Sequence, residues 1–450
     1  MITLIETLME EHGYDHDESI GPTTQLVRTL GFSSLDFVQL IVDIEAKFGR
    51  KLGFQALLLN NGTYVKDVNV GELVRFVRRQ LLEEQGGTAQ PVDNTIPELP
   101  ASRAETVLHH PRITEATVTA FRNTIRSRSL QAQAGTASKN PQAIFVLCPP
   151  RSGSTLLRVI LAGHPQLFAP PELYLLMYDD LAQRRQELAG EVNSHLMEGT
   201  IRALVELYGC DADTAEAMMA GFEQQRMRTR EFYRLMQKQL GERCLVDKTP
   251  LYPLDLNILA RAESDFEEPL YIHLIRHPYG MIRSYEESQL DRFTPVLYEN
   301  NFERSQLAEL TWVVSHRNIL EFKKQVPARR WLELHFESLV TNPGQEVARI
   351  CDLAGISLDP AMLEPYSAPE RRMLSGTRKL TRMPGDLKFH LHKGIEPESA
   401  TRWRQFLDQD FLGDLTWQLA ESMGYRQLDV QQLLAATVTT PSPPHAGVHG

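Results

Sequence analysis

The stretch AIFVLCPPRSGSTLL, residues 143–157, decides the fold of the larger part of this chain. Its first six residues are apolar and have the length of a buried strand. A proline pair follows, and the apolar spacing from Thr155 onward predicts that a helix begins there. A strand, a loop and a helix start in this order place free backbone N–H groups around one small site. The stretch therefore predicts an anion-binding loop.

The loop also supplies polar side chains. Arg151 brings a cation, and Gly153 lets the backbone approach a ligand closely; the other residues predicted to contact the anion are Ser152, Ser154, Thr155 and Leu156. A nucleotide P-loop needs GxxxxGK[ST], whereas here no lysine follows the glycine and the cation precedes it. This departure disfavours an ordinary ATPase. On this segment alone, a structural turn capped by Ser or Thr is the alternative.

Three further apolar runs are predicted strands, at residues 244–247, 269–275 and 331–336. Each is close to the mean strand length and is followed by a turn or a helix start. Strands that alternate with long helical stretches are typical of α/β proteins with a parallel sheet. We therefore predict an α/β domain with a central parallel sheet over 141–430, preceded by a connecting helical region over 112–140.

A second polar motif, HLIRHPYGMIRS at residues 273–284, follows another of these strands. The strand that ends at Ile275 leads directly to Arg276, and the next helix presents Ser284 eight residues later. The planar fork of an arginine and a serine hydroxyl together suit a phosphate. The motif predicts a second phosphate site, far from the first loop.

Residues 1–86 have a different character. They contain 13 acidic and 8 basic residues, so nearly half of the chain's net charge of −11 lies there. Their apolar residues recur at helical spacing and predict a small all-α helical bundle, in which GFSSLDFVQL (31–40) places Ser34 at the start of a helix. Gly, Pro and polar residues predict a flexible linker over 87–111, and a proline-rich end predicts a disordered tail over 431–450.

Composition excludes several classes of protein. The negative net charge argues against a general nucleic-acid binder. No apolar run approaches the roughly 20 residues of a membrane span, and the N-terminus carries acids where a signal peptide carries basic residues. The four cysteines are widely spaced and form no CxxC pair, which fits a reducing compartment. We expect a cytoplasmic protein with no nucleic-acid, membrane or metal partner.

Taken together, PRSGSTLL and RHPYGMIRS, about 125 residues apart, resemble the cofactor-binding signature of the sulfotransferase family over roughly residues 140–430. The resemblance implies that Arg151 and the loop after it hold the 5′-phosphosulfate of PAPS (3′-phosphoadenosine 5′-phosphosulfate). It implies that Arg276 and Ser284 hold the 3′-phosphate. Lys393 and Gly394, in FHLHKGIEP, resemble the late segment that contacts the same phosphate.

The resemblance also implies catalytic residues. HPQLFAPPELYLL (164–176) is similar to the tyrosylprotein and polyketide-associated branches of the family, where a glutamate at the position of Glu172 is the catalytic base. CLVDKTPLYP places Lys248 where the family has a lysine that stabilises charge on the transferring group. His390 and His392 are further candidates for the base. With Arg151, Lys248 and the loop amides stabilising charge, no metal is expected.

Gly31 to Leu35, with the amphipathic pattern that follows, resembles an acyl or peptidyl carrier protein, although Ser33 stands where such proteins usually have Asp. The resemblance implies phosphopantetheine on Ser34, and hence a phosphopantetheinyl transferase, an acyl or hydroxyacyl thioester, an upstream synthase and a thioesterase in trans as partners. A flexible linker of about 20 residues spans about 25 Å, which gives a millimolar effective concentration of the carrier.

Three functions are compatible with these motifs. The first is sulfuryl transfer from PAPS to the β-hydroxyl of a carrier-tethered acyl chain, in polyketide or related natural-product biosynthesis. The second is sulfation of a free alcohol, phenol or protein tyrosine, with the carrier as a docking module. The third is a P-loop kinase or a nucleotide-binding adaptor without catalysis.

Overall fold

The structure is a computed structural model, and it describes residues in both the N-terminal part and the remainder of the chain. In the N-terminal part the described residues are 2–11, 20–26, 68–83 and scattered positions between 29 and 64; in the remainder they are 111–125, 138–188, 196–288, 302–368, 371–373, 389 and 392–439. The chain divides into two compact units, Met1–His109 and His110–Gly450. Among the described helices, none has the length and apolarity that a membrane crossing requires.

The first unit contains the helices α1 (Ile2–Glu11) and α4 (Val70–Glu83) and a pair of two-residue antiparallel strands, β1 (Leu59–Asn60) and β2 (Thr63–Tyr64). Helix α4 begins with a reciprocal cap, because the Asn69 and Glu72 side chains each accept the other's backbone N–H at 2.8–2.9 Å. Helices fit the bundle predicted for 1–86, whereas the short strand pair was not predicted. Ser33 and Ser34 lie outside the described residues.

The second unit is built on a five-stranded sheet in the order β4-β5-β3-β6-β7, in which every neighbouring pair is parallel. Its strands are β3 (Ala143–Leu147), β4 (Leu167–Phe168), β5 (Cys244–Lys248), β6 (Leu270–Ile275) and β7 (Trp331–His335). The predicted parallel sheet is thus confirmed, and β4, a two-residue edge strand, is the addition. From β3 the chain passes to the edge strand β4, returns to β5 and then crosses to β6 and β7 on the other side of β3. The strand β3 thus lies at the point where the strand order reverses.

Helices connect these strands and flank the sheet. They are α5 (Glu115–Thr124), α6 (Ser154–Leu161), α7 (Leu181–Leu188), α8 (Glu198–Tyr208), α9 (Ala212–Gln224), α10 (Thr229–Leu240), α11 (Leu256–Asp265), α12 (Pro278–Ser288), α14 (Arg304–Lys323), α15 (Phe336–Thr341), α16 (Pro343–Ala354), α17 (Asp414–Ser422) and α18 (Gln427–Thr439). Short 3-10 turns lie at Tyr252–Leu254, Ala328–Arg330, Pro360–Leu363, Pro397–Ala400 and Arg402–Phe406.

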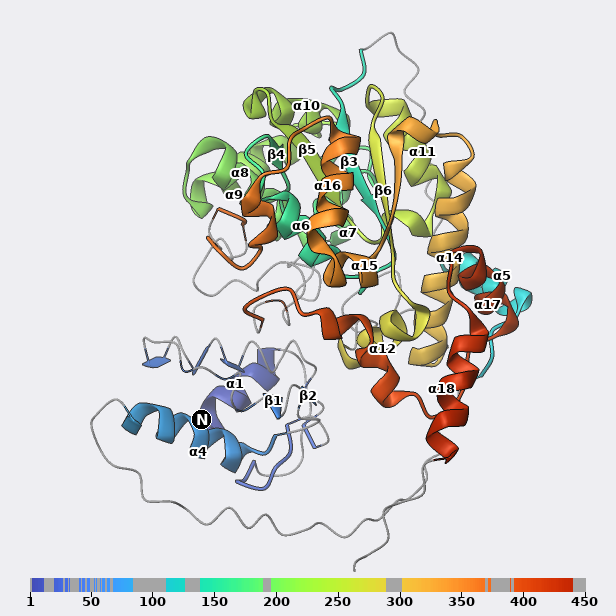
Figure 1. Ribbon diagram of the computed structural model, residues 1–450. Helices are drawn as coiled ribbons and strands as arrows, with labels where there is room; N and C mark the ends of the chain where they lie inside the picture. Colours follow the sequence, from blue (N-terminus) through green and yellow to red (C-terminus); the bar gives the residue numbers. More distant parts are fainter. Residues whose placement is uncertain are drawn as a thin grey trace, which may run out of the picture. The chain divides into compact units, whose positions relative to one another are not determined.

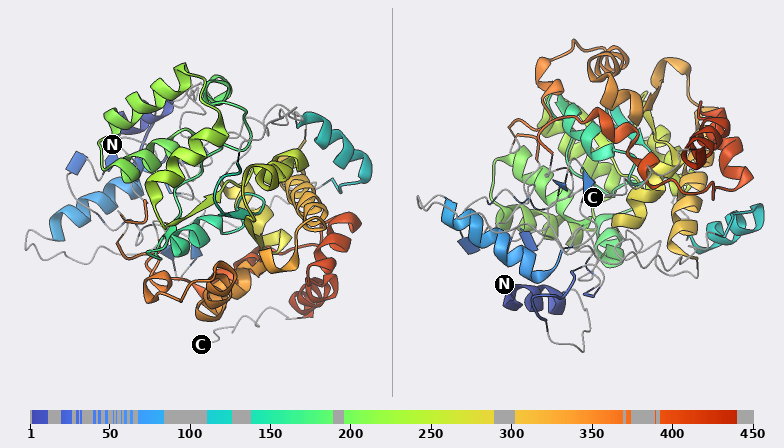
Figure 2. Two further views of the ribbon diagram at one scale, coloured as in Figure 1. Left: turned by 90° about the horizontal axis from the view of Figure 1, so that it is seen from above. Right: turned by 60° about the horizontal axis from the view of Figure 1, so that its bottom comes forward.

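The two faces of the sheet carry two separate hydrophobic cores, because alternate residues of a strand point to opposite faces. On β3, Phe145 belongs to a core that includes side chains of α10, α11 and α14, whereas Ile144 and Val146 belong to a core with α6, α15 and α16. Figure 1 shows α6 and α16 in front of the sheet, and the view from above in Figure 2 shows the green helices and the orange helices on opposite sides of it. Strands that are buried on both faces of the sheet have continuous apolar sequences, which explains the apolar runs of β3 and β6.

The ends of the second unit extend beyond the predicted domain limits. Helix α5 packs on α14, where Arg122 donates to Asn318 Oδ1 at 2.9 Å, so the connecting region is part of this unit. Helix α18 continues to Thr439, past residue 430, where the sequence analysis ends the domain. The helix continues because Leu433 and Leu434 pack against the core. The polar composition of the tail that follows hid these contacts from the sequence pattern.

A buried histidine pair links the sheet to α14. His273 on β6 and His316 on α14 are both fully buried, and His273 Nε2 lies 2.9 Å from His316 Nδ1. One nitrogen must donate and the other accept, so at least the accepting ring is neutral. Burial is the largest cause that lowers both pKa values: to about 3 for His316, and well below the usual range for His273.

We predict that this pair makes the second unit sensitive to acid. Below about pH 6.5 the unfolded chain protonates both histidines, whereas the folded unit keeps them neutral. The free energy of unfolding therefore falls as the pH drops from about 6.5 towards 3, by up to about 1.4 kcal/mol per pH unit for each histidine. Urea unfolding followed by tryptophan fluorescence reports this unit alone, since all four tryptophans lie in it.

His316→Gln is the matched variant for this prediction. Between about pH 6 and pH 4, it should reduce the slope of the unfolding free energy against pH by about 1.4 kcal/mol per pH unit. This is the contribution of one bound proton, because one titrating group is removed. Carboxylates contribute equally to the wild type and the variant, so the difference isolates the histidine. Identical slopes in the two proteins would contradict the prediction.

Candidate functional site

The carboxyl ends of four neighbouring strands supply the site. The anion loop follows β3, Lys248 ends β5, Arg276 comes directly after β6, and Phe336 comes directly after β7. In parallel sheets these ends lie along one edge, and the crevice beside the strand where the order reverses is the usual place for a ligand. The strand order thus gathers residues from four separate parts of the sequence.

The loop after β3 has the backbone of an anion site. Arg151 and Gly153 both adopt left-handed conformations, with φ values of 64° and 86°, and α6 begins immediately after at Ser154. This path turns successive N–H groups toward one point at the positive end of the helix. Ser152 is fully buried, and its hydroxyl has no hydrogen-bond partner among the described residues. A buried unpartnered hydroxyl in such a loop fits a bound anion.

Gly153 is required at its position for two reasons. Its φ of 86° is in the left-handed region, which side chains disfavour. In addition, a Cβ there would lie 2.2 Å from Cδ2 of Phe336, so the ring packs directly on the bare backbone. The same ring also contacts a cation: the Arg276 guanidinium lies 4.4 Å from its centroid, a cation–π contact.

The second motif touches the first loop. Arg276 Nη1 donates to the carbonyl of Arg151 at 2.7 Å, and Arg151 Nε donates to Ser284 Oγ at 3.1 Å. The sequence analysis placed the second phosphate site far from the loop, and the structure instead makes the two motifs parts of one cleft. The reason is the sheet order, because β3 and β6 are direct neighbours. That adjacency cannot be read from separations along the chain.

One cleft of about 870 Å³, including its open mouth, contains these groups. Its walls carry four arginines and two glutamates, an excess of positive charge: Arg151, Arg276, Arg283, Arg402, Glu287 and Glu396. Trp403 lines it too, and is stacked on His277 with ring centroids 4.1 Å apart. A cleft with a positive wall and an aromatic ring suits a phosphorylated nucleotide.

The late segment contributes only in part as predicted. Gly394 lines the cleft, whereas Lys393 is exposed and is not among the lining residues. His392 also lines it, and its Nδ1 lies 2.6 Å from Glu396 Oε1, while Arg402 donates to the other oxygen of Glu396 at 2.8 Å. His390 lies outside the described residues. No cluster of metal-ligating side chains occurs in the part of the chain that the structure describes.

Glu172 and Lys248 form an ion pair at the same edge of the sheet. Lys248 Nζ lies 2.5 Å from Glu172 Oε1; the lysine side chain is 1% exposed and the glutamate 21%. Both lie close to Cys148, the residue after β3: burial raises the pKa of its thiol to about 12, and Lys248 and Glu172 act on it in opposite directions. The pair thus lies beside the anion loop. The protonated thiol is a poor nucleophile.

Several contacts hold the backbone of Glu172 in place. Gly199 on α8 packs so closely that a Cβ there would lie 2.0 Å from the Glu172 carbonyl oxygen. Arg158 on α6 donates to the carbonyl of Ala169 at 3.1 Å, which ties this segment to the helix of the anion loop. Both contacts restrict where the carboxylate can lie.

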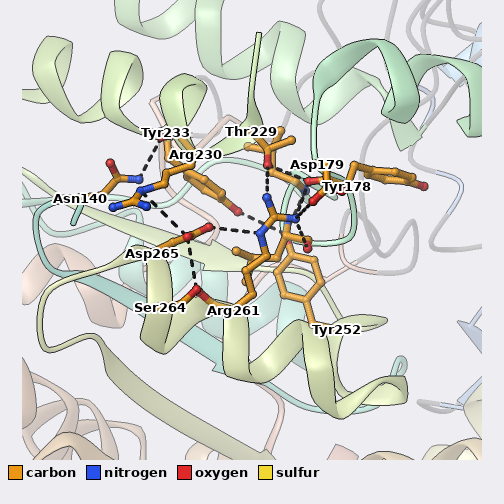
Figure 3. Close-up of polar contacts among 12 residues, drawn as sticks. Asn140, Tyr178, Asp179, Thr229, Arg230, Tyr233, Tyr252, Arg261, Ser264 and Asp265 are labelled. Carbon is orange, nitrogen blue, oxygen red and sulfur yellow. Dashed lines mark hydrogen bonds and ion pairs between the residues drawn. The ribbon is translucent and has the colours of Figure 1, made fainter. Parts of the chain in front are cut away.

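The segment after Glu172 is anchored by a buried arginine. Figure 3 shows Arg261 of α11 surrounded by acceptors. Its guanidinium donates to the carbonyls of Leu176 and Tyr178 at 3.2 and 2.6 Å, to Thr229 Oγ1 at 3.0 Å and to Asp265 Oδ2 at 3.2 Å. Thr229 in turn donates to the Tyr178 carbonyl at 2.7 Å. Buried side chains therefore satisfy the carbonyls of this irregular backbone, as neighbouring strands do within a sheet.

Sequence reasoning missed five residues of the site. Arg283 stands beside Ser284 in the second motif, so the motif itself could have indicated it. Phe336, Arg402 and Trp403 belong to no motif and reach the cleft only through folding. Tyr174, whose hydroxyl donates to Glu172 Oε2, lies two residues from the predicted base, and no spacing rule indicates it.

Comparison with known proteins shows two matches along the chain. A profile of the sulfotransferase family matches residues 141–360, and a profile of the phosphopantetheine attachment site matches residues 3–66. The chain is 26% identical over 307 residues to nodulation protein NoeE of Sinorhizobium fredii, a match that covers 64% of this chain and 67% of that protein.

Two solved structures resemble the second unit. The sulfotransferase domain from the curacin biosynthetic pathway is 33% identical, with a TM-score of 0.59 over 64% of this chain and 99% of that domain. The sulfotransferase domain from the olefin synthase of Synechococcus PCC 7002 is 38% identical, with a TM-score of 0.58 over 66% of this chain and 98% of that domain.

We predict that Gly153→Ala abolishes anion binding. The new Cβ would force Phe336 away from the loop and strain the backbone, so the N–H groups would no longer converge. Titration calorimetry with adenosine 3′,5′-bisphosphate should show affinity at least about a hundredfold weaker than in wild type. Gly209→Ala is the control, since Gly209 has a φ of 60° but a Cβ there meets nothing within 4 Å. Equal affinity in the two variants would contradict the role of Gly153.

Proposed function

Since the chain belongs to the sulfotransferase family and carries a phosphopantetheine attachment domain, we propose that it sulfates an acyl chain on its own carrier domain. The donor is PAPS, and the acceptor is the β-hydroxyl of an acyl chain tethered through phosphopantetheine to Ser34. The observation that carries the proposal is the presence of a positively charged cleft and a carrier domain in one polypeptide. One of the two similar solved domains comes from a biosynthetic pathway and the other from an olefin synthase, which supports an acceptor made in biosynthesis.

The residues of the cleft fit PAPS. The loop amides and the unpartnered Ser152 hydroxyl receive the 5′-phosphosulfate, and Arg276 and Ser284 receive the 3′-phosphate. Arg151 contacts both motifs, so it lies between the two anionic ends. Recognition of the 3′-phosphate is what separates PAPS from ATP, and a site with arginines at both ends serves that discrimination.

The reaction requires one proton transfer and one exchange of bonds at sulfur. The acceptor oxygen forms a bond to sulfur while the bond from sulfur to the bridging oxygen breaks, and the electron pair leaves on the 5′-phosphate. The hydroxyl proton passes to the carboxylate of Glu172, the base of the reaction. Charge on the transferring group is stabilised by Arg151, Lys248 and the loop amides.

The ion pair between Glu172 and Lys248 couples these two events. While the carboxylate is ionised, it holds the Lys248 ammonium at 2.5 Å. Once the carboxylate takes the acceptor's proton, it loses the charge that attracts the ammonium. Lys248 can then donate to the leaving oxygen at the moment when negative charge develops there. Base and charge stabiliser thus act in one sequence without a metal ion.

Delivery of the acceptor in cis needs no rigid docking. A carrier on the linker predicted from the sequence visits the sulfotransferase unit at millimolar effective concentration, so a weak contact between the two is sufficient. The thioester comes from an upstream synthase after a phosphopantetheinyl transferase has modified Ser34, and a thioesterase in trans releases the product.

The catalytic assignments predict a specific loss of rate. Glu172→Gln should lower kcat by about 10² to 10⁴, because the amide accepts a hydrogen bond from Lys248 but cannot take the proton. Lys248→Met should lower kcat as well. Calorimetric affinity for adenosine 3′,5′-bisphosphate should stay within about twofold of wild type in both variants. Wild-type turnover in either variant would remove that residue from the catalytic machinery.

The tethered acceptor is tested by intact-protein mass spectrometry. The chain is loaded with a 3-hydroxyacyl group by a phosphopantetheinyl transferase and the corresponding coenzyme A thioester, and then PAPS is added. We expect the mass of the acyl-pantetheine form to increase by one sulfo group, and Ser34→Ala to show neither change. Loading without sulfation would instead support a free alcohol, phenol or tyrosine acceptor, and the absence of loading would make the first unit a docking module.

A further inference from the structure

The carboxylate of Glu172 has a different partner on each oxygen. Oε1 pairs with the buried ammonium of Lys248, and Oε2 accepts a hydrogen bond from the hydroxyl of Tyr174. The Tyr174 side chain is buried, whereas 21% of the Glu172 side chain is exposed. Two donors from the protein side therefore fix the plane of the carboxylate and direct its exposed part outward.

Tyr174 is held in a backbone conformation that large residues rarely adopt. Its φ is 51°, in the left-handed region. Such strain persists only where surrounding contacts impose it, and it concentrates at functional sites. In this position the side chain turns back to reach the carboxylate two residues earlier, and a residue in extended conformation would point it elsewhere.

The contacts that impose this conformation come from the end of β5. The Tyr174 N–H donates to Thr249 Oγ1 at 3.4 Å, and the N–H groups of Leu175 and Leu176 donate to the hydroxyl of Tyr252 at 3.1 and 3.3 Å. One strained residue is thus followed by two whose backbone is fixed by a buried side chain.

Both of these hydroxyls are oriented by a single buried carboxylate. Thr249 Oγ1 donates to Asp247 Oδ1 at 3.0 Å, and Tyr252 donates to Asp247 Oδ2 at 2.9 Å. Asp247 immediately precedes Lys248, so the strand that carries the ammonium also holds the segment that carries the tyrosine. The two donors to the carboxylate, Lys248 and Tyr174, are therefore both positioned by the short stretch 247–252 at and after the end of β5.

The hydroxyl of Tyr174 remains a donor throughout the working pH range. Burial and the neighbouring Glu172 raise the pKa of Tyr174 well above its usual value. A neutral phenol can donate to the carboxylate but takes no proton from the acceptor. Its contribution is therefore geometric rather than acid–base.

From these contacts we propose that Tyr174 is a positioning residue for catalysis, which orients the Glu172 carboxylate toward the acceptor hydroxyl. The inference rests on the proposed function, in which Glu172 is the base. It adds a residue that acts only through that base and does not contribute to donor binding.

A double-mutant cycle tests this inference on the full, carrier-loaded chain. Tyr174→Phe keeps the ring and removes the hydroxyl. We expect about tenfold lower kcat, the usual effect of losing one hydrogen bond to a charged group, with the KM for PAPS unchanged within about twofold. In the Glu172→Gln background, the same change should have no further effect on kcat.

Two variants control for folding. Thr416→Val removes an equivalent bond, from a buried hydroxyl to the buried carboxylate of Glu309, and should lower the melting midpoint as much as Tyr174→Phe while leaving kcat unchanged. Thr249→Val keeps the side-chain shape but removes the hydroxyl between the Tyr174 N–H and Asp247. It should reproduce the selective fall in kcat, even if Tyr174→Phe folds poorly.

The results separate this inference from the proposal beneath it. Unchanged kcat in Tyr174→Phe, or the same tenfold loss in the Glu172→Gln background, would overturn the positioning role alone. A Glu172→Gln variant with wild-type kcat would overturn the assignment of the base, whatever Tyr174→Phe does. If Tyr174→Phe lowers kcat only when Glu172 is intact, the result supports both the positioning role of Tyr174 and the assignment of Glu172 as the base.

Discussion

The structure depends on one constraint: a five-stranded parallel sheet whose strand order reverses at β3. Parallel strands end along one edge, so each residue that follows a strand end is brought to the same crevice. The anion loop, Lys248, Arg276 and Phe336 come from strands that are far apart in sequence and become neighbours only there. The helices on both faces bury most of the sheet, and that burial holds the edge in a fixed geometry.

Within that edge, close packing rather than flexibility shapes the anion loop. Phe336 packs on the bare backbone of Gly153 and supports the Arg276 guanidinium on its ring. Arg276 then donates to the carbonyl of Arg151, which completes a closed set of contacts around the loop. The loop is thus preorganised for an anion, and binding need not pay for its ordering.

Buried polar groups perform the same task for the ion pair of Glu172 and Lys248. Arg261 donates hydrogen bonds to the backbone carbonyls of the segment after Glu172. Asp247 orients the hydroxyls of Thr249 and Tyr252, which accept hydrogen bonds from the backbone N–H groups of the same segment. Burying such groups is favourable only when all of them are paired, which gives the network one arrangement. The strained backbone of Tyr174 is maintained by this network.

Much of this protein was readable from local pattern. Apolar runs of strand length predicted β3, β5, β6 and β7, and two motifs predicted the loop and its partner Arg276, because these features depend on neighbours in the chain. Contacts between distant segments were not readable. Strand order made the two motifs adjacent, and folding brought Trp403 and Arg402 to the cleft and Tyr174 to Glu172. Local sequence specifies elements and reactive groups, whereas their distances in space follow from packing, which no single segment encodes.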